Sequence, residues 1–351
     1  MKYFNIPLLF AINLAVTSAH AVTLPGIPDF IDEMVAKHKF KRAELEKAFD
    51  VAQEVPAVID AISKPPSSKP WPEYRDSFVN PQRIKQGLEF WHKYHGTLRR
   101  AELKYGVPQD IIVAVIGVET IYGQDAGNFR TLDALTTLAF EYPQRADFFR
   151  SELENFLLLA REQQFDLLSI RGSYAGALGI PQFMPSSYRV YAVDFNGNRK
   201  INLLREDKDA IGSVANFLKV FGWISETTGA LHASDAGDPP HREGGGIPPI
   251  AVRAQVSDQV CAGDITTPRT LAAWSAAGIV PDEKLHSDLA ARLIDFTVGE
   301  GKEFWLVFNN FEVITRYNNS DYYAMTVFQL AEALKEARKD QLRKATRRAP
   351  S

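Results

Sequence analysis

The sequence predicts a mainly α fold of the α+β class, in which a helical core carries a flanking helical lobe and a small β-containing insertion. Helical periodicity recurs from residue 29 to residue 223. The segment 225–304 instead holds glycine- and proline-rich runs, with an alternating pattern at 250–256 that is typical of a strand. A chain of 351 residues, 45% of them hydrophobic, can bury the sizeable core that this arrangement needs.

Changes in sequence pattern mark the boundaries between these parts. Residues 1–21 combine Lys2, an apolar run and a closing Ala19-His20-Ala21, which is typical of a secretory signal with a small-residue cleavage site. We therefore expect a mature chain that begins near Val22, in the periplasm. The expected parts are the signal 1–21, a helical lobe 22–70 completed by a C-terminal helix 322–345, a core 71–224 completed by 305–321, and the insertion 225–304.

Charge and cysteine content argue against several classes of protein. The formal net charge of −3 argues against a nucleic-acid binder, which would be strongly basic. Cys261 is the only cysteine, so the chain forms no internal disulfide. It lies far from the signal and cannot carry an N-terminal lipid, and no histidine neighbours it in the sequence, which argues against thiol catalysis. We expect a soluble monomer without a membrane anchor.

The helical patterns follow one another along the chain. Asn80 and Pro81 open a long one, because asparagine caps helices and proline suits the first helical position. The apolar stripe from Phe148 to Leu157 indicates a core-facing helix, and Ser186 is expected to cap another. The expected helical segments are 30–38, 42–51, 57–62, 81–106, 108–122, 131–140, 144–163, 186–191, 207–221 and 322–339.

The central element of the core is the helix that Pro108 begins and Gly123 ends, with no charged residue between positions 111 and 118. Glu119 nevertheless falls in its last turn. Because an apolar setting and the negative end of the helix dipole both disfavour a carboxylate, we expect a raised pKa and a protonated Glu119 near neutral pH. A partly exposed glutamate, or one paired with an arginine, is equally compatible with this helix alone.

Metal-binding motifs are weak in this sequence. His92 and His95 lie three residues apart but lack a third ligand in a motif, so we expect surface histidines. Residues 194–209 resemble the start of a calcium loop, with oxygen ligands at its first, third and fifth positions. Arg199 replaces the usual turn glycine, however, and Arg205 replaces the closing glutamate. A polar Asn-Gly turn explains the segment equally well.

The glycine-rich segment 172–186 is the expected partner of Glu119. Its glycines let another chain approach closely, while Ser173, Gln182 and Phe183 supply a hydroxyl, an amide and an aromatic face. This mixture suits a sugar, although a Gly-Pro turn between two helices would look similar.

Four segments together resemble the lytic murein transglycosylase B family, namely GVETIYG at 117–123, LDALTTLAFEYPQRADFF at 132–149, SYAGALGIPQFMPSSY at 173–188 and AVDFNGN at 192–198. The resemblance extends from Tyr74 to Trp223 and resumes at 314–325. It implies a lysozyme-like helical core that acts on the glycan strands of bacterial peptidoglycan, with proteins of cell-wall synthesis as candidate partners.

The resemblance also assigns residues. It makes Glu119 the single acid and base, without a required cofactor, and it places a cation, Ca²⁺ or Na⁺, in the loop 194–209. The matching substrate-binding residues are Tyr74, Arg145, Ser173, Gln182, Phe183, Tyr317 and Asn318. The matching cation ligands are Asp194, Asn196, Asn198, the carbonyl of Lys200, and Asp209.

The sequence departs from the family pattern at several positions. Lipoprotein members carry a cysteine just after the signal, where this chain has Val22. The first of a usual arginine pair is Gln144, which is expected to weaken a contact to the peptide or acidic part of the substrate, and a common tyrosine is Phe217. Asn196 and Asn198 are expected to bind the cation more weakly than aspartates would.

Most glycosidases use two carboxylates, but only Glu119 is a convincing candidate here. We expect Glu119 to protonate the β-1,4 bond between MurNAc and GlcNAc, and then to deprotonate the C6 hydroxyl, which attacks C1 and leaves a 1,6-anhydro product. The 2-acetamido group of the substrate would shield C1 in between. Three alternatives remain open, namely a hydrolytic muramidase on the same fold, a non-catalytic glycan-binding or scaffold protein, and a calcium-controlled envelope protein.

Overall fold

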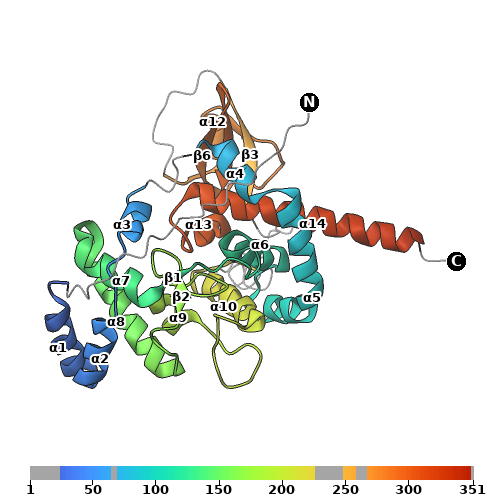
Figure 1. The fold of residues 1–351 in the computed structure, drawn as a ribbon. Helices are drawn as coiled ribbons and strands as arrows, with labels where there is room; N and C mark the ends of the chain where they lie inside the picture. The colour runs from blue at the N-terminus through green and yellow to red at the C-terminus, as the bar shows by residue number, and fades with distance from the viewer. Residues whose placement is uncertain (1–23, 65–68, 226–247, 258–266, 349–351) are drawn as a thin grey trace, which may run out of the picture.

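The computed structural model describes residues 24–64, 69–225, 248–257 and 267–348. The expected signal at 1–21 and Cys261 lie outside these residues. The described chain is mainly helical with a small antiparallel sheet, which confirms the predicted fold class (Figure 1). None of the helices in these ranges is both long and apolar enough to cross a membrane.

Helix α6 (Gln109–Thr120) forms the centre of the core, and its residues from 111 to 118 are all buried. It ends slightly earlier than the sequence predicts. Pro108 precedes the first turn as the N-cap, and the left-handed backbone already begins at Ile121 and continues to Gly123. Glu119 therefore lies in the last turn, as predicted.

Other helices cover α6 on several sides, because a helix that is apolar all round must be covered on all of them. The helices in direct contact with it are α5 (Pro81–Tyr105), α10 (Asp207–Val220) and α14 (Asp321–Arg348). Helices α4 (Trp71–Phe78) and α13 (Asn309–Thr315) pack in turn on α14. As predicted, Asn80 caps α5, since its side chain accepts a hydrogen bond from the Arg83 amide at 2.9 Å.

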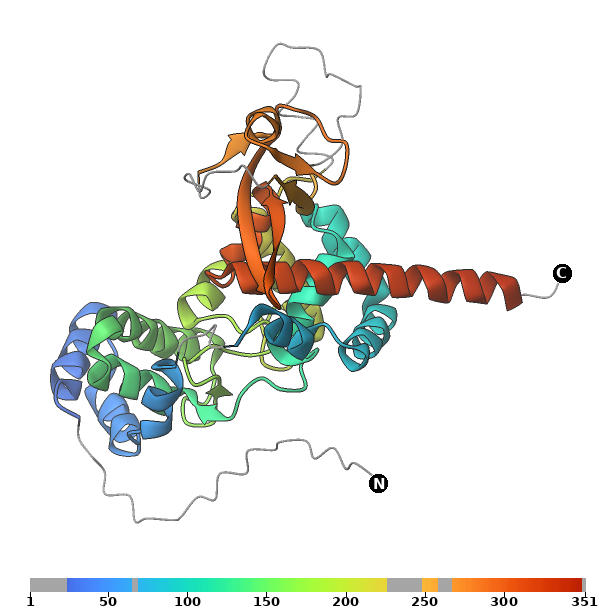
Figure 2. The same ribbon diagram turned by 90° about the horizontal axis from the view of Figure 1, so that it is seen from above.

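The C-terminal helix corrects the predicted division into lobes. Residues 322–345 were expected to complete the N-terminal lobe, whereas α14 packs against α4, α5, α6 and α13 and so belongs to the core. The apolar face of α14 predicts that this face is buried, but it does not predict which other helices cover it. Figure 2 shows that the C-terminal half of α14 projects from the helical body.

The N-terminal lobe lies against the two helices that follow the central one (Figure 1). Its helices are α1 (Ile27–His38), α2 (Arg42–Asp50) and α3 (Pro56–Ile62), and they meet α7 (Thr131–Glu141) and α8 (Ala146–Gln163). The rings of Phe30 and Phe140 pack edge to face at 6.1 Å, and His38 Nε2 lies 2.6 Å from Glu154 Oε1. The lobe is thus attached to the core through both apolar and polar contacts.

Two local predictions around α8 are wrong. Phe148 was expected in the apolar stripe of the core but is 39% exposed, whereas Leu157 is buried. Ser186 was expected to cap the next helix, but α9 (Pro185–Tyr191) begins before it, and Ser186 lies within the first turn. Pro185 occupies the first helical position, so proline and not Ser186 marks the start of α9.

The insertion forms a five-stranded antiparallel sheet in the order β4-β6-β7-β3-β5. Its elements are β3 (Ala251–Val256), β4 (Arg269–Thr270), α12 (Leu271–Ala276), β5 (Ile279–Pro281), β6 (Ala290–Val298) and β7 (Gly301–Val307). Strand β3 falls within the alternating pattern that predicted it. A separate apolar cluster around Trp274, Leu293 and Leu306 gives the sheet its own small core.

Candidate active site

Glu119 is a half-buried carboxyl group with one hydrogen-bond donor among the described residues. The hydroxyl of Tyr323 donates to its Oε1 atom at 2.5 Å. Burial raises the pKa of Glu119 to about 7, and the hydrogen bond from Tyr323 opposes this rise. No charged group of the described chain contributes to the shift, so the alternative of an arginine partner is excluded for these residues. Near neutral pH a large fraction of Glu119 therefore carries a proton.

Three tyrosines from separate elements surround Glu119. Tyr74 lies on α4, Tyr317 in the loop between α13 and α14, and Tyr323 near the start of α14. Burial, followed by the negative charge of Glu119, raises the pKa of all three, so their hydroxyls stay protonated. The rings of Tyr317 and Tyr323 stack at 6.2 Å with an interplanar angle of 15°.

Tyr323 is the residue that sequence reasoning missed. Tyr74 and Tyr317 were predicted through the family resemblance, and the structure brings both to Glu119. Tyr323 belongs to the same segment, 314–325. The sequence alone does not show whether Tyr323 or the adjacent Tyr322 contacts Glu119. The choice follows from burial, because Tyr323 is only 2% exposed.

The glycine-rich segment is tied directly to the helix that carries Glu119. The hydroxyl of Thr120 donates to the Ile180 carbonyl at 2.7 Å, and that of Tyr317 donates to the Pro181 carbonyl at 2.6 Å. Gly179 has a φ of +70°, and a Cβ atom there would lie 2.3 Å from the Leu203 carbonyl oxygen. The close approach predicted for the glycines is therefore required at this position.

The polar side chains of this segment hold its own backbone in place. Ser173 Oγ accepts a hydrogen bond from the Ala177 amide at 3.0 Å. Gln182 Nε2 donates to the carbonyls of Gly179 at 2.8 Å and Ala126 at 3.1 Å. Both side chains are half-buried.

Phe183 does not offer the aromatic face that the sequence analysis expected. It is 2% exposed and packs against Phe217 and Tyr317, with ring centroids 5.5 and 5.7 Å apart. The residue pairs with Leu178 across a short antiparallel bridge, which turns its side chain into the core. Phe183 therefore packs against the ring of Tyr317 and supports it.

Arg145 and Asn318 are exposed, and no contact in the described ranges joins either of them to Glu119. The Arg145 guanidinium lies over the Phe148 ring, 4.3 Å from its centroid. This contact gives the unexpected exposure of Phe148 a physical reason, since the charged group covers the ring.

The loop 194–209 is organised around carboxylates that bind backbone amides. Asp194 accepts hydrogen bonds from the amides of Gly197 at 2.7 Å and Arg199 at 2.7 Å. Asp209 is fully buried and accepts from the amides of Phe195 at 2.9 Å and Asn202 at 3.0 Å. Arg199 adopts a φ of +68°, so the loop makes its turn without the usual glycine.

Glu206 supplies a third carboxylate to this loop, where it faces two asparagine side chains. The side-chain amide of Asn196 donates to it, and that of Asn198 lies 3.1 Å from both of its oxygens. Within the described ranges no three His, Cys, Asp or Glu side chains gather as a metal site, so a cation here depends on amide and carbonyl oxygens as well. Such an all-oxygen donor set fits calcium.

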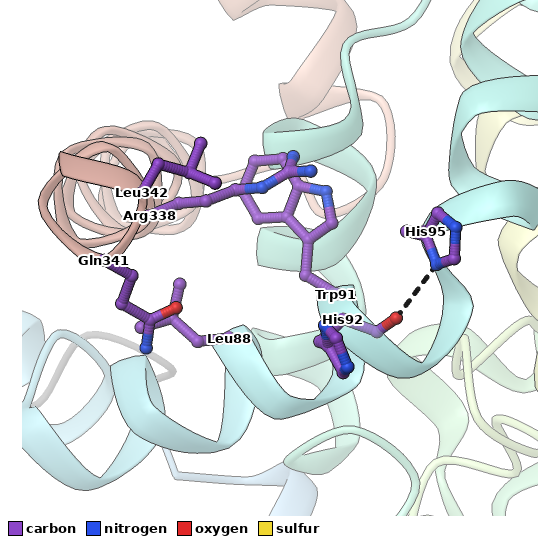
Figure 3. A pocket seen from close by; sticks show the side chains of 7 residues that line it. All are labelled: Leu88, Trp91, His92, His95, Arg338, Gln341 and Leu342. Atoms are coloured by element: carbon purple, nitrogen blue, oxygen red, sulfur yellow. Dashed lines mark hydrogen bonds between the residues drawn. The ribbon is translucent and has the colours of Figure 1, made fainter. Parts of the chain in front are cut away.

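A surface pocket where α14 leaves the body contains the two histidines considered as metal ligands (Figure 3). It is lined by Leu88, Trp91, His92, His95, Arg338, Gln341 and Leu342. A ring nitrogen of His95 lies 3.1 Å from the His92 carbonyl oxygen, so that ring is engaged by its own helix. The expectation of surface histidines holds for both residues, since His92 and His95 are exposed.

The fold and the site together define a class of protein, namely lysozyme-like enzymes with a protonatable glutamate in the helical core. The family model described as the Transglycosylase SLT domain matches residues 25–332. The membrane-bound lytic murein transglycosylase B of Escherichia coli is 42% identical over 324 residues, which cover 90% of this chain and 84% of that protein.

Solved structures agree with this assignment. The soluble lytic transglycosylase SltB1 of Pseudomonas aeruginosa superposes with a TM-score of 0.78 at 42% identity, over 90% of this chain and all of the other. Slt35 of Escherichia coli, solved in complex with calcium, gives 0.78 at 41% identity, over 90% of this chain and 94% of the other. The chain belongs to the lytic murein transglycosylase family and is an enzyme of this class.

Proposed function

We propose that this enzyme cleaves the MurNAc-β-1,4-GlcNAc bond of periplasmic peptidoglycan without water and leaves a 1,6-anhydro-MurNAc end. Glu119 acts as the single general acid and base. The observation that carries this proposal is the position of Glu119, a carboxyl group whose pKa burial raises to about 7 and whose only donor in the described chain is a neutral tyrosine.

In the first step, neutral Glu119 donates its proton to the glycosidic oxygen while the bond from that oxygen to C1 breaks. The new carboxylate then accepts the hydrogen bond from Tyr323 at full strength, because bonds to a charged acceptor are stronger than bonds to a neutral one. The 2-acetamido group of the substrate shields C1 in this interval, which removes the need for a second enzyme carboxylate.

In the second step, the Glu119 carboxylate removes the proton of the MurNAc C6 hydroxyl, and that oxygen attacks C1. The proton gained equals the proton given in the first step, so the enzyme returns to its starting state and no water is consumed. Among the described residues no second carboxylate contributes to the raised pKa of Glu119, which supports a mechanism with one acid.

For substrate binding we propose surfaces that flank the glutamate. Tyr74 offers its ring and hydroxyl beside it, and Tyr317 offers its ring, since its hydroxyl donates to the Pro181 carbonyl. Ser173 and Gln182 line the glycine-rich loop. Arg145 and Asn318 are exposed and contact the more distant, peptide-bearing part of the glycan. Phe183 acts indirectly, through the Tyr317 ring that it supports.

We further propose that calcium binds in the loop 194–209, as a calcium complex of the related Slt35 suggests. The ligands would be Asp194, Asn196, Asn198, the Lys200 carbonyl, and a closing carboxylate from Glu206 or Asp209. The ion stabilises the loop and takes no part in the chemistry. Its effect reaches the site because the Ile180 amide donates to the Leu203 carbonyl at 2.9 Å. Calcium should raise the melting temperature, and Asp194→Asn should remove that increase.

The products released from purified sacculi test the proposed reaction. Mass spectrometry should find muropeptides with 1,6-anhydro ends, which lack the mass of one water. Hydrated reducing ends would instead establish a hydrolytic muramidase. Binding to sacculi without any release of muropeptides would establish a non-catalytic glycan-binding protein.

A further inference from the structure

Arg292 on strand β6 connects the sheet of the insertion to both helices that flank the active-site loop 316–320. Its Nε atom lies 2.8 Å from Glu312 Oε1 on α13. Its two terminal nitrogens lie 3.0 and 2.7 Å from the two carboxylate oxygens of Asp321, the first residue of α14. One side chain thus holds the two ends of this loop.

The residues held in this way are those that face Glu119. Tyr317 lies within the loop, and Tyr323 lies two residues after Asp321, in the same first turn of α14. A movement of Asp321 therefore displaces the Tyr323 hydroxyl, which lies 2.5 Å from the Glu119 carboxylate. Sub-ångström positioning of this kind has a large effect on rate.

The chemistry of Arg292 suits a positioning role. Its planar guanidinium matches the Asp321 carboxylate in a bidentate pair and has a further donor for Glu312, so it fixes direction as well as distance. The Arg292 side chain is 18% exposed, which limits competition from water. Arg292 also lies on the β6–β7 hairpin, where it pairs with Val307. Val307 is the last residue of β7, just before the chain enters α13.

The same sheet holds the other tyrosine-bearing helix. Trp71 of α4 donates through Nε1 to Glu303 of β7 at 2.7 Å, and its ring stacks on Phe296 of β6 at 4.4 Å. Tyr74 lies one turn further along α4. The sheet therefore contacts α4 and α14, which carry Tyr74 and Tyr323, and both helices that flank the loop of Tyr317.

We propose that the insertion serves as a rigid frame for the active site and that Arg292 is its positioning residue, which sets Tyr317 and Tyr323 against Glu119. This inference rests on the proposed function of Glu119. Arg292 does not touch the substrate. It acts through Asp321 and Glu312 on the loop between them.

The test compares two arginines of the insertion in the full-length enzyme. Arg292→Met should lower kcat on soluble glycan strands by roughly 10- to 100-fold, with a smaller change in KM, because the catalytic geometry changes more than the binding surface does. The matched control is Arg269→Met, which removes an arginine of the same sheet whose guanidinium lies over the Trp274 ring, in the separate apolar cluster of the insertion. The control should keep kcat within twofold.

A second set of variants separates positioning from folding. Asp321→Asn should lower kcat in the same way, and the double variant should be no worse than Arg292→Met alone, because that substitution already removes the pair with Asp321 together with the contact to Glu312. Arg292→Lys should recover part of kcat, since lysine keeps the charge but loses the fork. Circular dichroism and melting curves identify any variant that fails to fold, and Asp321→Asn then serves as the test.

The outcomes distinguish this inference from the proposed function. An Arg292→Met enzyme that keeps kcat within twofold of the wild type would overturn the role of Arg292 alone. Equal losses of kcat in Arg292→Met and Arg269→Met would also overturn it, because the effect would then be general destabilisation of the sheet. A wild-type enzyme that releases no anhydro ends would overturn the proposed function and this inference with it.

Discussion

Glu119 on α6 and Glu152 on α8 have surroundings that differ in a way that separates structure from chemistry. Glu152 on α8 is 4% exposed and accepts hydrogen bonds from the Ser186 amide at 2.9 Å and the Ser186 hydroxyl at 2.5 Å. It therefore satisfies the N-terminal turn of α9. Glu119 instead lies at the C-terminal end of α6, where no backbone amide in the described chain donates to it.

Burial raises the pKa of both carboxyl groups, so a raised pKa alone does not mark the catalytic one. The difference lies in what occupies the oxygens. Both oxygens of Glu152 are engaged by Ser186, whereas the described residues engage only one oxygen of Glu119. The second oxygen of Glu119 can exchange a proton with a substrate, because no protein group has to be displaced.

The largest expected effect is the loss of turnover in Glu119→Gln. Glutamine keeps the size and the hydrogen bond from Tyr323 but cannot transfer a proton, so activity should fall at least 10²- to 10⁴-fold while glycan binding persists. Release of muropeptides and pelleting with sacculi measure the two properties. Glu162→Gln, an exposed change on α8, serves as the control. Retention of a tenth of the activity would refute the role of Glu119.

The same substitution should change how stability depends on pH. The pKa of Glu119 in the folded state, about 7, lies above its ordinary value of 4.5, so ionisation destabilises the folded protein as pH rises between these values. Glu119→Gln removes this penalty. It should match the wild type near pH 4.5 and exceed it by about 3 kcal/mol in free energy of unfolding above pH 7.5. Urea unfolding between pH 4.5 and 7.5 measures the free energies of unfolding of both proteins. If their difference did not change with pH, the raised pKa of Glu119 would be contradicted.

Glu152 should show the reverse behaviour. Glu152→Ala leaves the Ser186 amide and hydroxyl without their acceptor and should lower the free energy of unfolding by about 2 kcal/mol. The specific activity of the folded fraction should change little. Glu162→Ala on the same helix, which removes a surface ion pair, should cost less than about 1 kcal/mol. A loss of activity at full stability in Glu152→Ala would erase the distinction between the two glutamates.

The sequence predicted those features that depend on residues close together in the chain. The apolar run of α6 and the place of Glu119 within it follow from helical periodicity alone. The family resemblance added Tyr74 and Tyr317, which no local pattern could have selected. Asn80 and the strand β3 were likewise predicted by local rules of capping and alternation.

The missed features depend on contacts between distant segments. The hydrogen bond from Tyr323 to Glu119 joins positions 204 residues apart. Phe183 was expected to offer its aromatic face to a sugar, and its inward direction depends on Phe217 and Tyr317, which come from other elements. The apolar face of α14 predicted burial without predicting the partner, so the helix was assigned to the wrong lobe.

The smallest expected effect concerns the Tyr323 hydroxyl, which donates the hydrogen bond to Glu119. Tyr323→Phe should lower kcat by about tenfold, because the hydroxyl stabilises the carboxylate formed after proton donation. Since this bond lowers the pKa of Glu119, its removal should move the alkaline limb of the kcat profile, expected near pH 7, to higher pH. Tyr322→Phe, whose ring packs on Trp71 and Phe296, should leave the limb in place. A limb that moves to lower pH, or that moves equally in both variants, would show that Tyr323 does not tune the acid.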